Sequence, residues 1–273
     1  MVRYKVIERK KPLGTTREKE EIINRKKAAI RTLNDLLEKY IKDSTSTSLK
    51  KADLLSYWVK DYTKYIQQEE TFDSSKLPRY KRGAVIRVNF GFNVGKEFGG
   101  LHLAVVLDND NKRNADVITV IPLSSTDGRT VHERSVDLGS ELYKKVIENH
   151  TKVFNEISER LDKNSVLINK HYTRLSSPPK LTPEEEAEML PLVLQTMKEN
   201  EYIKSTLDML KNHRKEIERM KHGSMAVVNQ ITTISKQRIY IPKKSSDFLY
   251  GITLSPSEMD KINAKIKELY IFE

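Results

Sequence analysis

The sequence predicts an α+β protein in which long helices flank and interrupt a small antiparallel sheet. Two periods in the pattern of apolar residues support this class. Over residues 15–69 and 139–222, apolar side chains recur at three- and four-residue steps, as on one face of a helix. Over residues 85–121, β-rich runs are bounded by Gly, Asn and Asp, as in a meander of short strands. Helices and strands should therefore occupy separate stretches of the chain.

The N-terminal region, residues 1–78, is expected to be helical. An amphipathic helix is predicted from Thr15 to Asp43, and a Ser/Thr stretch at residues 44–48 ends it. A second helix is predicted from Leu49 to about Glu69, with apolar residues on one side. Because the break between them is short, we expect a helical hairpin.

The strands that follow are interrupted by an insertion of roughly 80 residues, about Gly139 to His222. Its sequence predicts two long helices that form an antiparallel, coiled-coil-like hairpin. A break over LSSPPKLTPEEE separates them, and Thr182, Pro183 and Glu185 predict the start of the second helix. Two apolar stripes are expected to face a partner, one with Val146, Val153, Phe154, Ile157 and Leu161, the other with Leu190, Val193, Leu194, Met197, Leu207, Leu210, Ile217 and Met220.

Composition narrows the class of protein. The chain has 273 residues, a formal charge of +11 and a pI near 9.5, which favours a polyanionic partner such as nucleic acid; a charge spread over helices for solubility is the alternative. The absence of cysteine excludes disulfides and Cys-based zinc sites and suits a reducing cytosol. The longest apolar stretch, within residues 101–107, is far short of the roughly 20 residues of a membrane span. We expect a soluble cytoplasmic protein.

Several ordered motifs resemble one family. They are the segment after Arg82-Gly83, the loop with Gly95 and Glu97-Phe98-Gly99-Gly100, the run Ala104 to Leu107, and Val120 to Ser125. A second block, GSMAVVNQITTISKQRI from Gly223, contains Asn229-Gln230 followed by Ile231 and Ile234. In LSPSEMDKINAKIKELY, Ser255, Pro256 and Glu258 predict a capped C-terminal helix. Together these motifs resemble the PemK/MazF toxins of bacterial toxin–antitoxin pairs.

This resemblance implies a small, strongly curved antiparallel β-barrel of the PemK/MazF/CcdB kind, formed by residues 79–138 and 223–273. Residues 139–222 would be a helical hairpin insertion. The implied activity is a metal-independent endoribonuclease that cleaves single-stranded RNA by 2′-OH attack and leaves a 2′,3′-cyclic phosphate. The implied partners are RNA, an acidic antitoxin protein and a second copy in a homodimer.

The resemblance also implies which residues act. The family places an Arg just before the second strand and a Thr or Ser at the end of the third; here these positions are His102 and Ser124. A histidine suits proton transfer at neutral pH, because its ordinary pKa is about 6.5. Gly99 and Gly100 would let a ligand approach the backbone closely. The other expected substrate-binding residues are Lys96, Glu97, Ser125, Arg129, His132, Arg134 and Gln230.

Two motifs are set aside. GFNVGK at residues 91–96 falls one residue short of a phosphate-binding loop and is followed by Glu97, so no nucleotide cradle is expected. His132-Glu133 lacks a second histidine four residues further on. We therefore expect neither a metal nor a cofactor. Two other functions stay open: a non-catalytic barrel that binds RNA or a protein partner, and a gyrase-directed, hence DNA-associated, toxin of the CcdB kind.

Overall fold

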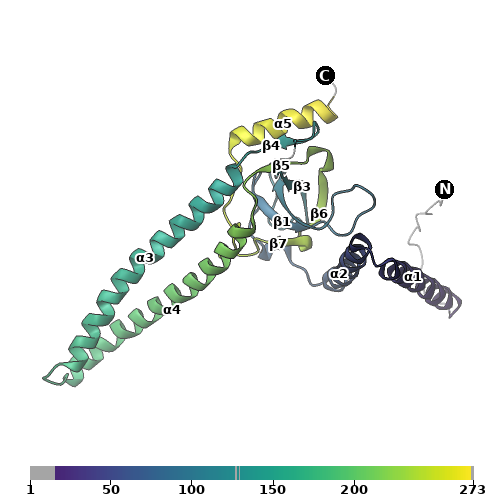
Figure 1. Ribbon diagram of the computed structural model, residues 1–273. Helices are drawn as coiled ribbons and strands as arrows, with labels where there is room; N and C mark the ends of the chain where they lie inside the picture. The colour runs from purple at the N-terminus through teal and green to yellow at the C-terminus, as the bar shows by residue number, and fades with distance from the viewer. Residues whose placement is uncertain (1–15, 127, 129, 272–273) are drawn as a thin grey trace. The chain divides into compact units, whose positions relative to one another are not determined.

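The computed structural model of the chain describes residues 16–126, 128 and 130–271 (Figure 1). It confirms the α+β class: five α-helices accompany a seven-stranded antiparallel sheet among these residues. The chain divides into two compact units, one ending at Lys64 and the other beginning at Tyr65.

The first unit contains α1 (Thr16–Asp43) and most of α2 (Ser46–Gln68). The chain turns at Ser44, whose φ of 52° lies in the left-handed region, and the Asp43 carboxylate accepts hydrogen bonds from the hydroxyls of Thr45 and Ser48. Both predicted helices are confirmed, although α2 begins three residues earlier than expected. No residue of α1 is buried, and Ala52 is the buried residue of α2. Their apolar stripes therefore remain largely exposed.

The second unit contains the sheet, in the strand order β4-β5-β3-β2-β1-β7, with β6 paired to β3. The sheet is not closed into a complete barrel. The short 3-10 helices are η1 (Ser74–Lys76), η2 (Val228–Gln230) and η3 (Lys236–Arg238). The strands are β1 (Val85–Asn89), β2 (Leu101–Val106), β3 (Val117–Ser125), β4 (Val136–Asp137), β5 (Ser224–Ala226), β6 (Thr232–Ser235) and β7 (Ile239–Ile241).

Alternating residues of the strands supply two apolar clusters, one on each face of the sheet. One includes Val105 and Ile121 and extends to Leu142 of α3 and Ile262 of α5 (Pro256–Tyr270). The other includes Ala104, Val106, Ile118 and Val120 and is covered by Leu77, Tyr80 and Phe90. Both faces of β2 and β3 are therefore buried over their paired length.

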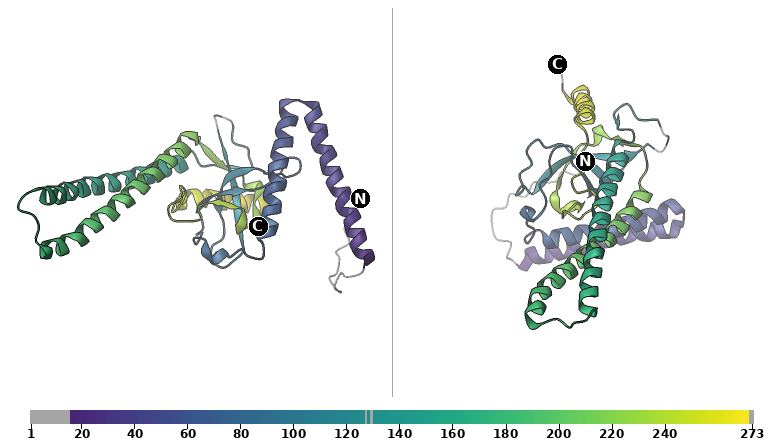
Figure 2. Two further views of the ribbon diagram at one scale, coloured as in Figure 1. Left: turned by 90° about the horizontal axis from the view of Figure 1, so that it is seen from below. Right: turned by 90° about the vertical axis from the view of Figure 1, so that its left-hand side faces the viewer.

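The predicted insertion is a pair of antiparallel helices, α3 (Glu141–Ser176) and α4 (Pro183–Arg219), which extend away from the sheet (Figures 1 and 2). The capping box of Thr182 and Glu185 is present as predicted. The predicted apolar stripe of α3 is only partly right. Val146 and Ile157 are buried, whereas Phe154 and Leu161 are 48% and 38% exposed.

Polar contacts fill much of the seam between α3 and α4. Arg160 forms a bidentate pair with Glu199 at 2.6 and 2.7 Å, and the guanidinium lies over the Tyr202 ring. The rings of His171 and His150 are hydrogen-bonded to the Thr196 hydroxyl and to the Leu210 carbonyl. The hairpin is thus held together by directional contacts as well as by burial of a few apolar residues.

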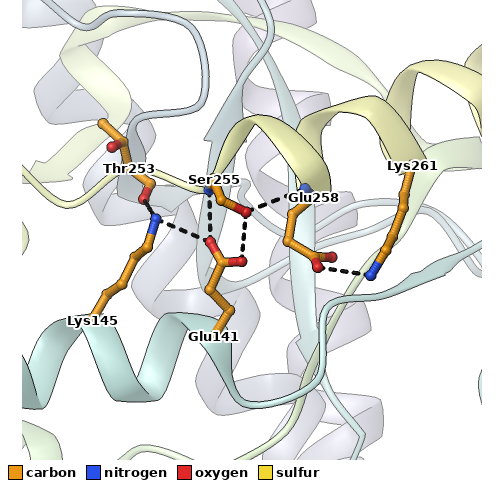
Figure 3. A network of polar contacts seen from close by, with 6 residues as sticks. All are labelled: Glu141, Lys145, Thr253, Ser255, Glu258 and Lys261. Carbon is orange, nitrogen blue, oxygen red and sulfur yellow. Dashed lines mark hydrogen bonds and ion pairs between the residues drawn. The ribbon is translucent and has the colours of Figure 1, made fainter.

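A polar network ties the start of α3 to the start of α5 (Figure 3). The Glu141 carboxylate accepts the backbone N–H of Ser255 at 2.6 Å and its hydroxyl at 2.7 Å, and Lys145 pairs with the same carboxylate. Ser255 caps α5 as predicted, but the predicted capping box is only half formed, because the Glu258 side chain does not accept the Ser255 N–H. Glu258 pairs with Lys261, and Glu141 takes the Ser255 N–H in its place.

Replacing Glu141 by Gln should destabilise the fold by about 1–2 kcal/mol at pH 7, because hydrogen bonds to a charged group are lost. Burial raises the pKa of Glu141, but the hydrogen bonds from Ser255 and Lys145 outweigh it, so the pKa lies below its ordinary 4.5. The contribution of the Glu141 carboxylate to the stability of the fold is therefore fully present above pH 4.5, and it is lost as the pH falls through the lowered pKa. Urea unfolding at pH 7 and at acidic pH checks this, with the exposed Glu148→Gln as control. A difference from the parent chain that persists unchanged in acid would contradict the assignment.

Candidate functional site

A groove of about 680 Å³ opens where β2 and β3 separate. The pairing of these strands ends at Ala104 and Pro122; residues 101–103 pair with β1, and residues 123–125 pair with β5. The ends of the two inserted helices complete the groove. Its lining comprises Arg87, Leu101, His102, Leu103, Leu123, Ser124, Ser125, Leu142, Tyr143, Glu216, Arg219, Met220, Lys221, Gly223 and Ser224.

The structure brings His102 and Ser124 to this one groove, although 22 positions separate them in the sequence. Ala104 lies opposite Pro122 in the last pair of the antiparallel ladder, so His102 and Ser124 each lie two residues beyond that pair, on the two strands that border the opening. Ser125, a predicted binding residue, also lines the groove. Strand register is the physical reason that these positions converge.

The His102 ring is exposed on one side and packed on the other. Its centroid lies 4.7 Å from that of Phe98 in an edge-to-face arrangement. Partial loss of water around the ring lowers the pKa of His102 below its ordinary 6.5. At neutral pH the imidazole is therefore mainly uncharged and can accept a proton.

Positive charge reaches the groove from residues that sequence reasoning missed. Arg87 of β1 pairs with Glu216 at 2.9 Å, and Arg219 approaches the same carboxylate at 3.5 Å. Lys221 adds a third cation to the lining. The signals were present in the sequence: Arg87 interrupts the apolar strand VIRV, while Arg219 and Lys221 directly precede the block at Gly223.

The loop between β1 and β2 lies next to the groove and owes its shape to its glycines. A Cβ on Gly99 would lie 2.8 Å from the Gly91 carbonyl oxygen, and Gly100 has a φ of +85°. The conformation of the loop itself therefore requires glycine at positions 99 and 100, apart from any approach of a ligand. Lys96 and Glu97 are exposed on this loop and are not among the groove-lining residues.

Gln230 acts on the loop from η2. Its carbonyl oxygen accepts the Phe98 N–H at 3.2 Å, and its amide donates to the Lys96 carbonyl at 3.4 Å. Since Phe98 packs on His102, Gln230 indirectly supports the position of that ring. The geometry gives Gln230 a positioning role in the loop.

The remaining predicted residues do not meet at the groove. His132 and Arg134 are exposed in the segment before β4, where the Nδ1 atom of His132 accepts the Arg134 N–H. Arg129 lies outside the described residues. In the part of the chain that the structure describes, no group of three or more His, Asp or Glu side chains could hold a metal ion. None of the described helices is long and apolar enough to cross a membrane.

The fold and groove define an α+β protein with a basic cleft that contains a histidine and a serine. Residues 81–177 match the model of a family described as the PemK-like, MazF-like toxin of type II toxin–antitoxin systems. The matched segment runs from before β1 to the end of α3. Over this segment, the predicted resemblance to the PemK/MazF toxins is thereby confirmed. Comparison with curated proteins gave no significant match.

Replacing Gln230 by Ala should loosen the loop between β1 and β2. A neutral hydrogen bond contributes about 1 kcal/mol, so amide exchange at Phe98 should accelerate roughly fivefold. Hydrogen exchange monitored by NMR provides the measurement, and the exposed neighbour Asn229→Ala is the matched control. Equal exchange rates at Phe98 in both variants would remove Gln230 from this role.

Proposed function

We propose that this chain is the toxin of a type II toxin–antitoxin pair and acts as a metal-independent endoribonuclease on single-stranded RNA. The observation that carries the proposal is the presence of His102 and Ser124 in one basic groove. The family match supports the toxin class. The chemistry of the groove supports RNA cleavage as the activity of that toxin.

The proposed reaction begins with RNA bound so that a 2′-OH faces His102. The neutral imidazole accepts the 2′-OH proton as O2′ forms a bond to the adjacent phosphorus. The bond from phosphorus to O5′ then breaks, solvent water supplies the proton to the leaving O5′ oxygen, and His102 returns its proton to solvent. The products are a 2′,3′-cyclic phosphate and a 5′-OH, and no redox partner is required.

The transition state carries negative charge on the phosphate oxygens, which hydrogen-bond donors and cations stabilise. The Ser124 hydroxyl is proposed as one donor. Arg219 and Arg87 are proposed as cations that take over the electrostatic part of the missing family arginine. Glu216 offsets part of this charge, so the bound phosphate competes with a carboxylate already paired to both arginines.

The charge of the groove also supports a proposal for neutralisation by a protein partner. A basic cleft that accepts phosphate accepts carboxylates by the same electrostatics, so we propose an acidic antitoxin segment as its inhibitor. The family's dimeric assembly and a cytoplasmic location are part of this proposal. A purely RNA-binding barrel and a gyrase-directed toxin are the outcomes that an inactive but folded protein would support.

The alanine variant His102→Ala should lower kcat/KM for RNA cleavage by about 10²-fold to 10⁴-fold, because the proton acceptor is removed. His102→Arg, which restores the family residue, should keep part of the activity. Cleavage of single-stranded RNA in EDTA provides the measurement, and His132→Ala is the control outside the groove. Full activity of His102→Ala would refute the assignment.

Ser124→Ala should cost less, on the order of 10²-fold, because a single transition-state hydrogen bond is removed. Circular dichroism of each variant separates lost chemistry from lost fold. A rate equal to that of the parent chain would assign Ser124 to structure alone.

The rate of RNA cleavage should also depend on pH through the protonation of His102. The acceptor must be neutral, and its pKa is lowered by partial desolvation, so kcat/KM should rise with pH with a midpoint below the ordinary pKa of histidine. This ratio reports the free enzyme, which avoids the effect of bound phosphate on the histidine. Profiles at constant ionic strength give the midpoint, and a midpoint above pH 7 would contradict a desolvated histidine base.

A further inference from the structure

One face of α3 carries a stripe without a single charged residue. Its nine members follow alternating four- and three-residue steps, the spacing of a coiled-coil seam. The chain as a whole is 32% charged, so about three charges would be expected among nine positions. The stripe consists of Ile147, Thr151, Phe154, Ser158, Leu161, Ser165, Ile168, Tyr172 and Leu175.

This stripe does not face α4. Its large members are exposed, with Ile168 at 41%, Leu175 at 57% and Tyr172 at 70%. The side of α3 that does face α4 presents His150, Arg160 and His171, which hydrogen-bond to α4 or pair with it. In an amphipathic helix the apolar side normally faces the partner, so this arrangement leaves the coiled-coil seam of α3 without one.

The order of side chains within the stripe identifies the partner. Large residues occupy one heptad position, namely Ile147, Phe154, Leu161, Ile168 and Leu175. Small ones occupy three of the four places at the other, namely Thr151, Ser158 and Ser165, with Tyr172 as the fourth. Such a surface needs a partner whose large residues lie opposite its small ones, and an antiparallel copy of the same stripe meets this requirement.

We propose that two copies of this chain associate through α3 in an antiparallel, two-fold coiled coil. With Leu161 of one copy opposite Ser158 of the other, Phe154 lies opposite Ser165, Ile168 opposite Thr151, and Tyr172 opposite Ile147. The contacts are reciprocal, as a two-fold interface requires. Each of these layers contains a large residue, and three of the four pair it with a small one, which favours close packing.

A parallel arrangement in register fits less well. It would stack Ser158 on Ser158 and Ser165 on Ser165, which leaves voids, and Phe154 on Phe154, which crowds the seam. Burial of the serines in the antiparallel arrangement carries little penalty where the hydroxyl is already bonded. Ser165 donates to the Leu161 carbonyl at 2.8 Å within its own helix.

The association is tested by sedimentation equilibrium of the full chain between about 1 and 100 μM, a range suited to interfaces of modest area. Leu161→Glu should raise the dissociation constant of the association through α3, as distinct from the family's dimeric assembly, about 100-fold or more, since symmetry places two charges in the seam. Val166→Glu is the matched control, because Val166 is 69% exposed on the same helix but outside the stripe. An unassociated parent chain, or equal association of both variants, would overturn the proposal.

Cross-linking tests the direction of the helices and does not depend on RNA cleavage. The chain contains no cysteine, so a single introduced thiol is unique. In the antiparallel register, the two copies of position 158 are about 4.5 Å apart along the axis, whereas those of position 165 are about 16 Å apart. A short bis-maleimide should therefore link the Ser158→Cys variant and not Ser165→Cys. Efficient linkage of both would indicate a parallel pair, and linkage of neither would show that α3 does not self-associate; either result refutes the proposal.

Discussion

The pairing of β3 on both of its edges is the constraint on which the second unit depends. One edge bonds to β2, while the other bonds to β6 through residues 117–120 and to β5 through residues 123–125. A strand that is shared in this way must change partners along its length. Because β2 leaves β3 after the Ala104–Pro122 pair while β5 continues, the sheet opens at this end and the groove forms there. The opening is therefore a consequence of strand register and needs no separate cavity in the core.

The helical insertion forms the α3–α4 hairpin, and its two ends also line the groove. Since it connects β4 to β5, its first and last residues must return to the edge at which β3 ends. Leu142 of α3 enters the apolar cluster beside Ile121, and the Glu141 carboxylate anchors the first turn to Ser255 of α5. The end of α4 brings Glu216 and Arg219 to the groove. An insertion at this point thus changes the chemistry of the site without a change in the strands that form it.

Local signals in the sequence predicted the elements well, and long-range contacts limited the rest. Periodicity and caps gave both long helices of the insertion and the start of α4 at Thr182. The family pattern led to His102 and Ser124, which do share a groove. Periodicity could not show which of two apolar stripes of α3 would face α4, because Val146 and Phe154 both fit a helical pattern. The partner of the Ser255 N–H was missed for a similar reason, since Glu141 is 114 positions away.

Two side chains that set the charge of the groove, Arg87 and Glu216, also help to attach the hairpin to the sheet. Arg87 belongs to β1 and Glu216 to α4, so their ion pair joins the sheet to the insertion. Both side chains are largely shielded, with 20% and 30% of their area exposed, and such a pair is screened by salt less than a surface pair. A phosphate that bound to Arg87 would compete with Glu216 and weaken this link. Binding of a polyanion to Arg87 therefore weakens the attachment of α4 to the sheet. Arg219 contacts the same carboxylate and would remain as a partner for Glu216, which reduces this effect.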